Sequence, residues 1–208
     1  MKKRSLALFF AFVAALVFAP ANPALAAPAI GSAAPDFQLN DSDGQSRSLS
    51  EFKGKYVVLE WTNPQCPFVV KHYKSGNMPS LQKWAKEKSV VWLTIDSSAP
   101  GAEGYLSEAD AKKMRASNYA APTALLLDPD GKVGQLYGAK TTPHMFIIDP
   151  QGKLLYAGAI DSIRSANIDD IAKATNYVKV GLEEAMAGKP LTTPTSQAYG
   201  CSVKYARK

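Results

Sequence analysis

A short apolar run that leads into a lone cysteine is the feature that most constrains the fold of this chain. Residues 56–61 are almost entirely apolar and lie between turn signals, which is typical of a strand covered on both faces. Cys66 and Pro67 follow, and proline is favoured in the first turn of a helix. Unpaired N–H groups at a helix start stabilise a thiolate, so we expect Cys66 to be nucleophilic. A small buried apolar residue, or half of a structural disulfide, is the alternative interpretation.

Strand and helix patterns alternate along the rest of the chain. Alternating units imply a mainly parallel sheet, and a terminal hairpin adds antiparallel strands. The sequence therefore predicts an α/β fold with a mixed central sheet and helices on both faces, and with Cys66 at the carboxyl end of a parallel strand. The expected strands cover 37–39, 48–52, 56–61, 89–95, 123–127, 145–148 and 153–158, and the expected helices cover 68–73, 78–85, 106–121, 133–137 and 167–187.

The beginning of the chain has the pattern of a secretion signal. Three cations at positions 2–4 precede an apolar run over 6–19, and small residues stand at positions 24 and 26. We expect cleavage before Ala27 and export to the periplasm or the medium of a bacterium. The run is short for a membrane span, so no stable membrane anchor is expected after cleavage. The predicted division is a signal peptide at 1–26, one domain at 27–188 and a C-terminal tail at 189–208.

The charge balance excludes one large class of partner. Loss of the signal segment lowers the formal net charge from +6 to +3, because that segment holds three cations and no acids. No block of basic residues with interleaved aromatic residues is present. A nucleic-acid partner is therefore not expected.

Only two cysteines are present, Cys66 and Cys201. In an exported chain they can form a structural disulfide, a catalytic disulfide that cycles, or two independent thiols. Neither has the paired spacing of a zinc site, so no metal and no cofactor are expected.

A family resemblance rests on the element order, on the cysteine between strand and helix, and on the Thr141-Thr142-Pro143 segment before the hairpin. The chain resembles the thioredoxin fold, in its peroxiredoxin-like (redoxin) branch of the alkyl hydroperoxide reductase/thiol-specific antioxidant type. The resemblance implies a three-layer α/β/α sandwich with an N-terminal β-hairpin extension. It also implies a cis peptide bond at Pro143, beside the active cysteine. Asn63 stands where thioredoxins carry the first cysteine of Cys-x-x-Cys, so Cys66 must act alone or with a distant partner.

The C-terminal block Tyr199-Gly200-Cys201-Ser202 resembles the terminal Gly-Cys-Ser block of a subgroup of peroxiredoxin-like proteins. The tail before it has no apolar periodicity, so it can reach back over the sheet. Our hypothesis is that Cys201 resolves a sulfenic acid on Cys66 and forms an intrachain disulfide with it. A permanent disulfide that pins the tail remains the alternative.

Several further residues are candidates for the site. Thr142 is expected to help hold the oxygens of a peroxide, and Trp61 is expected to shape or cover the pocket. His144 is the histidine expected nearer the sulfur, whereas His72 lies nearly two helical turns from it. Glu60 is interpreted as a surface carboxylate, with a buried base as the alternative. The residues predicted to line the site are Trp61, Asn63, Cys66, Pro67, Thr142, Pro143, His144 and Cys201, while the roles of Glu60, His72 and Arg164 stay open.

Two classes of function follow. The first is a thiol-dependent oxidoreductase that acts on a peroxide or a disulfide-bearing substrate through Cys66 and needs an external thiol reductant. The second is a non-enzymatic binding module, such as a copper carrier resembling the Sco proteins, with a structural Cys66–Cys201 disulfide. Soft metals favour paired thiolates, and Asn63 removes one of them.

Overall fold

The computed structural model describes residues 27–117 and 121–206, so the predicted signal segment lies outside the described residues. Within those ranges no helix combines the length and the apolar character needed to cross a membrane. The strands are β1 (Gln38–Asp41), β2 (Ser46–Ser48), β3 (Val57–Thr62), β4 (Val91–Asp96), β5 (Ala124–Leu127), β6 (Thr141–Thr142), β7 (His144–Ile148), β8 (Leu154–Gly158) and β9 (Cys201–Ser202). The helices are η1 (Leu49–Phe52), α1 (Pro67–Lys74), α2 (Asn77–Glu87), α3 (Glu108–Ala116), α4 (Lys132–Tyr137), η2 (Ile168–Lys173) and α5 (Tyr177–Met186), where η marks a 3-10 helix.

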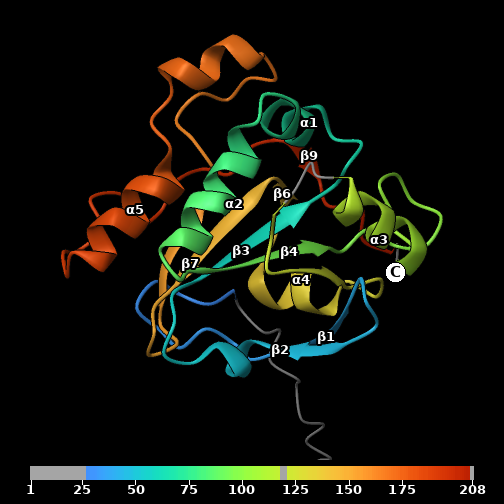
Figure 1. The fold of residues 1–208 in the computed structure, drawn as a ribbon, viewed down its shortest axis with the longest axis horizontal. Helices are drawn as coiled ribbons and strands as arrows, with labels where there is room; N and C mark the ends of the chain where they lie inside the picture. The colour runs from blue at the N-terminus through green and yellow to red at the C-terminus, as the bar shows by residue number, and fades with distance from the viewer. Residues whose placement is uncertain (1–26, 118–120, 207–208) are drawn as a thin grey trace, which may run out of the picture.

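Seven of the strands form one mixed sheet in the order β2-β1-β5-β4-β3-β7-β8 (Figure 1). The strands β3, β4 and β5 run parallel, whereas β7 pairs antiparallel with β3 and β8 pairs antiparallel with β7. The N-terminal hairpin of β1 and β2 extends the sheet by pairing with β5. The predicted mixed sheet is confirmed, and β3 lies near its centre.

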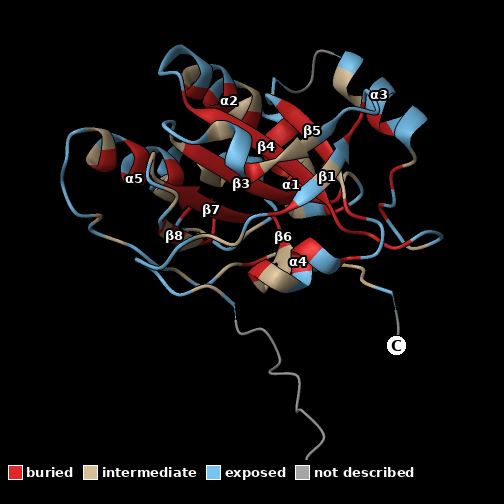
Figure 2. Cartoon of the chain, turned by 90° about the horizontal axis from the view of Figure 1, so that it is seen from below, coloured by how far each residue is buried: buried red, intermediate tan, exposed pale blue. Residues whose placement is uncertain are grey.

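Helices cover both faces of the sheet, which gives three layers (Figure 1). Successive side chains of a strand point to opposite faces. Val58 therefore packs with α1, α2 and α5, whereas Leu59 and Trp61 pack with α4 on the other face. The strands β3, β4 and β7 are buried along their length (Figure 2). The predicted sandwich is confirmed.

The closing helix differs from the prediction. Residues 167–187 were expected to form one helix, but the structure has η2, a break at 174–176 and then α5. The Asn176 side chain caps α5 by accepting a hydrogen bond from the Lys179 backbone N–H at 2.9 Å, and the Tyr177 N–H donates to the Ile160 carbonyl at 3.0 Å. These contacts tie the chain to the loop after β8 and restart the helix there. Apolar spacing was misleading because Ile168 is 45 % exposed.

The segment 48–52, expected to be a strand, is also different. Only Ser48 belongs to β2, and residues 49–52 form the 3-10 helix η1. The Ser48 backbone N–H donates to the Glu51 carboxylate at 3.1 Å, which stabilises the first turn of η1.

Candidate active site

Cys66 lies where β3 gives way to α1. It is the N-cap residue of α1, and Pro67 occupies the first helical position. The Cys66 carbonyl accepts hydrogen bonds from the N–H groups of Val69 and Val70 at 3.0 and 2.8 Å. The side chain is fully buried. The strand therefore delivers the sulfur to a helix start, but the sulfur is sealed from solvent.

The Asn63 amide shapes the turn that carries the sulfur. Its Oδ1 accepts a hydrogen bond from the Gln65 N–H at 2.8 Å, and its Nδ2 donates to the Glu103 carbonyl at 3.2 Å. A Cβ at Gly104 would overlap the same amide. The Asn63 side chain thus holds the loop around Gly104 against the turn.

The bond between Thr142 and Pro143 is cis, as the resemblance implied. It brings the Thr142 carbonyl within 3.1 Å of the Cys66 Sγ, which donates a hydrogen bond to it. The Thr142 hydroxyl is buried and has no hydrogen-bond partner within the described residues. The same residue thus gives the sulfur a carbonyl acceptor and leaves one buried hydroxyl unused.

The tail brings the second cysteine to the same place. The strand β9 pairs antiparallel with β6, which sets Cys201 opposite Thr142. The Cys201 backbone N–H donates a hydrogen bond to the Cys66 Sγ at 3.4 Å. Both cysteines are free thiols, and Cys201 is partly exposed. Two residues 135 positions apart in the chain thus share one site.

The surroundings of the two thiols shift their pKa values in opposite directions. Burial alone would raise the pKa of Cys66, but contacts with the Cys201 and Thr142 side chains and with the N–H groups of Cys201 and Val69 lower this pKa below its ordinary value. Burial, together with the hydrogen bond and the charge of Cys66, raises the pKa of Cys201 to about 12. The first proton is therefore lost from Cys66, and Cys201 stays protonated beside the resulting thiolate.

Residues 196–204 form a segment that we call the C-terminal strap. The Ala159 N–H donates to the Ser196 Oγ at 2.9 Å, and the Tyr199 hydroxyl donates to Asp161. At the far end, the Ala99 N–H donates to the Lys204 carbonyl at 2.8 Å. Hydrogen bonds at both ends thus hold Cys201 over Cys66.

Gly200 is expected to be essential for strap closure. Its φ is +133°, and a Cβ there would overlap the Thr142 carbonyl. Gly200→Ala should therefore destabilise the closed strap by about 1–3 kcal/mol and speed alkylation of Cys66 by about 5- to 150-fold. Alkylation rates read by mass spectrometry check this. Gly152→Ala is the matched control, because Gly152 has φ +83° but open space around it, and an equal rate in both variants would contradict the account.

The strap is held by a buried polar cluster of Asp161, Lys71 and His72, which we call the strap anchor. Asp161 accepts the Tyr199 hydroxyl and lies 3.7 Å from both the Lys71 Nζ and the His72 Nε2. Burial lowers the pKa of His72 to about 4, although Asp161 opposes this, and the Asn77 amide meets its Nδ1 at 2.8 Å. His72 is therefore a neutral, buried residue next to Asp161, and among the described residues no hydrogen bond joins it to Cys66.

Two predicted residues lie elsewhere than expected. Trp61 was expected to shape the pocket, but it is fully buried against Tyr137 and Phe146, in the core cluster on the face opposite to that of Cys66. It points there because side chains of β3 alternate between the faces. Glu60 was interpreted as a surface carboxylate, which is wrong, because it is fully buried on the α1 and α2 face.

The Glu60 carboxylate is the centre of a buried hydrogen-bond network. It accepts from the Trp92 Nε1 at 2.7 Å, the Tyr73 hydroxyl at 2.8 Å, the Thr94 hydroxyl at 3.0 Å and the Gln82 amide at 3.1 Å. Burial raises its pKa, and the four donors partly offset the rise. This network joins β3, β4, α1 and α2 under the site.

His144 and Arg164 lie on the other side of the strap. The His144 Nδ1 accepts from the Lys140 N–H at 3.3 Å, and the Arg164 Nη1 donates to the Gln197 Oε1 at 2.9 Å. Both line a cavity of about 560 Å³ beside the strap, which does not include Cys66. The structure thus brings together Asn63, Cys66, Pro67, Thr142, Pro143 and Cys201, and separates Trp61 and His144 from them.

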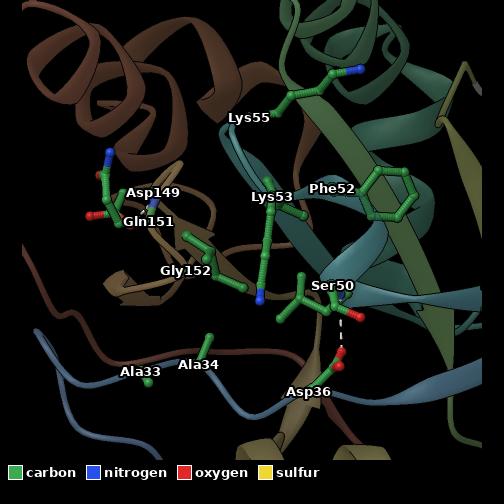
Figure 3. Close-up of a pocket in the computed structure, with 13 residues that line it drawn as sticks. Ala33, Ala34, Asp36, Ser50, Phe52, Lys53, Lys55, Asp149, Gln151 and Gly152 are labelled. Atoms are coloured by element: carbon green, nitrogen blue, oxygen red, sulfur yellow. Dashed lines mark hydrogen bonds between the residues drawn. The ribbon is translucent and has the colours of Figure 1, made fainter.

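A second cavity, of about 290 Å³, lies at the opposite end of β3, next to Val57 and the β7–β8 turn (Figure 3). Lys53 extends into it and Lys55 points away (Figure 3). It is far from the sulfur, which follows the other end of the strand. In residues 27–117 and 121–206 no group of three or more His, Cys, Asp or Glu side chains is arranged to hold a metal ion, so the copper-carrier interpretation gains no ligand set there.

Sequence reasoning missed the strap anchor. Asp161 follows β8 and Lys71 precedes His72 on α1, and neither stands in a motif. Tyr199 and Gly200 were visible only as neighbours of Cys201. No local signal shows that a tyrosine near the end of the chain meets an aspartate in a loop.

The sheet order, the cysteine at the start of α1 and the adjoining cis-proline define a thioredoxin-fold thiol protein. The profile of the AhpC/TSA family matches residues 30–157, and the chain belongs to this family. The strap lies outside the matched residues, so the placement of Cys201 rests on the structure alone.

Individual relatives agree with this class. The thiol-disulfide oxidoreductase ResA of Bacillus thuringiensis subsp. konkukian is 30% identical over 127 residues, which cover 61% of this chain and 67% of that protein. The chloroplastic peroxiredoxin Q of Triticum aestivum is 29% identical over 136 residues, which cover 61% of this chain and 57% of that protein. The thioredoxin domain of the thiol-disulfide oxidoreductase BVU-2223 from Bacteroides vulgatus has a similar fold, with a TM-score of 0.51 at 24% identity over 70% of this chain and 96% of that one.

Proposed function

We propose that this protein is a thiol-dependent oxidoreductase in which Cys66 is the nucleophile and Cys201 is the resolving thiol. One observation carries the proposal: the Cys201 N–H donates to the Cys66 Sγ at 3.4 Å while both residues are free thiols. The lowered pKa of Cys66 supports its role as the attacking atom. Family membership and the oxidoreductase relatives support the same reaction class.

A hydroperoxide is the oxidant that the site favours. The Cys66 sulfur is fully buried, so a small oxidant reaches it more readily than a disulfide on a protein surface does. The thiolate attacks the terminal peroxide oxygen, the O–O bond breaks, and the alcohol or water leaves with a proton. A sulfenic acid remains on Cys66. The Thr142 hydroxyl is available to hold the departing oxygen.

Cys201 completes the reaction. Loss of the negative charge on Cys66 removes one cause of the raised pKa of Cys201, so its thiol ionises more readily at this stage. The Cys201 sulfur then attacks the sulfenic sulfur, an S–S bond forms, and the oxygen leaves as water. An external dithiol supplies two electrons and restores both thiols. Cys201 is the partly exposed member of the pair, and the reductant meets its sulfur first.

Thiol-disulfide exchange is the second candidate, favoured by the similarity to ResA. Steady-state assays with dithiothreitol as reductant separate the two. We expect hydrogen peroxide to be consumed faster than a protein disulfide is reduced. Faster reduction of the protein disulfide would replace the first candidate with the second, and activity on neither substrate would contradict both.

The pH dependence of Cys66 ionisation tests the coupling of the two thiols. Cys201→Ala removes a donor to the thiolate and should raise the pKa of Cys66, whereas Cys201→Ser keeps a hydroxyl donor and should raise it less. Thiolate formation, and peroxide reactivity with it, then begins at a higher pH in the alanine variant. Ultraviolet absorbance of the thiolate across a pH titration measures this. Identical titration curves for all three proteins would show that Cys201 does not tune Cys66.

The division of the chain and its export belong to the same proposal. The charge and apolar pattern of residues 1–26 supports a cleaved signal peptide, a redox domain at 27–188 and a tail at 189–208, in a periplasmic or secreted protein. N-terminal sequencing of the exported protein should begin at Ala27, and an intact Met1 would contradict this.

A further inference from the structure

The cavity beside the strap has the size of a small-molecule site. Its volume is about 560 Å³, and it is bounded by the end of α4, by β7 and β8, and by strap residues 196–200. Ligand cavities in proteins commonly measure about 300–1,000 Å³. We call it the strap cavity. None of the residues that line it is a cysteine.

Positive charge dominates the lining. Lys140 and Arg164 are among the lining residues, and no aspartate or glutamate stands among them in the described part of the chain. Arg164 is tethered to the strap by its Nη1 bond to Gln197, and a guanidinium has further N–H donors beyond that one. Two cations without a facing acid attract an anion.

His144 adds a neutral donor that lacks a partner. Its side chain is 9 % exposed and lines the strap cavity. Because the Nδ1 accepts from the Lys140 N–H, a neutral ring carries its proton on Nε2, and this N–H has no partner within the described residues. Burial and the nearby Lys140 lower the pKa of His144 to about 4, which keeps the ring neutral. The ring packs against Phe146, with the two ring centroids 4.5 Å apart.

We propose that the strap cavity binds a small organic carboxylate. The carboxylate lies among Arg164, Lys140 and the His144 Nε2–H, whose N–H donors match its two oxygens. The rest of the molecule lies on Phe146 and Ala157, which supply an apolar floor. A carboxylate suits this mixture of cations, one neutral donor and apolar surface better than a compact multivalent anion does.

Binding is coupled to the strap, because residues 196–200 form one wall of the cavity. A ligand that contacts this wall binds only while the strap is closed, and it therefore stabilises the closed state. Cys66 is fully buried in that state. The bound carboxylate should slow the access of an alkylating reagent to Cys66.

Titration calorimetry with 3-phenylpropanoate and its neutral amide tests the proposal on the exported wild-type protein. We expect the acid to bind at least about tenfold more tightly than the amide. Arg164→Gln or Lys140→Gln should weaken binding of the acid about tenfold. Lys86→Gln is the control, because this exposed lysine lies at the end of α2. The affinity of this variant for the acid should equal that of the wild-type protein. Equal affinities for acid and amide, or no binding at all, would overturn the site without any need for a variant.

A second measurement tests the coupling. Alkylation of Cys66 should slow several-fold at a saturating concentration of the acid and stay unchanged with the amide. An unchanged rate with the acid bound would overturn the coupling to the strap. Neither measurement depends on peroxide turnover, so failure here is distinguishable from failure of the proposed redox function.

Discussion

Replacement of Cys66 by serine is expected to reduce peroxide turnover to the uncatalysed background. The serine hydroxyl is a poor nucleophile at neutral pH and cannot form a disulfide with Cys201. The fold should persist, because serine is small and is a favoured N-cap residue at the start of α1. A steady-state assay with dithiothreitol and hydrogen peroxide measures the loss, and circular dichroism checks the fold.

Cys201→Ser provides the matched comparison. It keeps the nucleophile but removes the resolving sulfur, so one equivalent of peroxide should be consumed rapidly per protein before turnover slows. A Cys66→Ser variant that keeps measurable turnover would contradict the assignment of the nucleophile. Equal steady-state rates for Cys201→Ser and wild type would show that the external thiol, and not Cys201, resolves the sulfenic acid.

Glu60→Ala is expected to lower the free energy of unfolding by about 3–5 kcal/mol, because it leaves several buried donors without an acceptor and opens a cavity. The affected donors are those of Trp92, Tyr73, Thr94 and Gln82. Urea unfolding followed by tryptophan fluorescence measures the change. The network joins four elements, so the loss should reach the whole domain.

Two variants control this experiment. Glu60→Gln keeps the shape of the side chain and one acceptor oxygen, so it should lower the free energy of unfolding less than Glu60→Ala does. Glu87→Ala removes an exposed carboxylate at the end of α2 and should change stability by no more than about 0.5 kcal/mol. If Glu60→Ala is as stable as Glu87→Ala, the buried network does not hold the domain together.

Local patterns in the sequence predicted the strand that ends before Cys66 and the helix that starts at Pro67. The apolar run before Cys66 became β3, and Pro67 became the first residue of α1, because strand burial and helix starts have short-range signals. The cis bond at Pro143 was expected from the family resemblance and is confirmed. The alternation of strand and helix patterns predicted the mixed sheet, but not the order of the strands within it.

The rest of the site depends on contacts between distant residues. The tail has no periodicity, so nothing local decides that Cys201 pairs opposite Thr142. Glu60 looked like a surface residue because its four donors come from other elements, and only the packed structure satisfies its charge. The helix over 167–187 was mistaken because the bond from Tyr177 to the Ile160 carbonyl breaks it.

Mass mapping of the two cysteines after one equivalent of hydrogen peroxide tests the central claim most directly. The proximity of the Cys201 N–H to the Cys66 Sγ predicts a single intrachain Cys66–Cys201 disulfide, which disappears on reduction with dithiothreitol. A Cys66 that advances to sulfinic acid while Cys201 remains a free thiol would contradict the account.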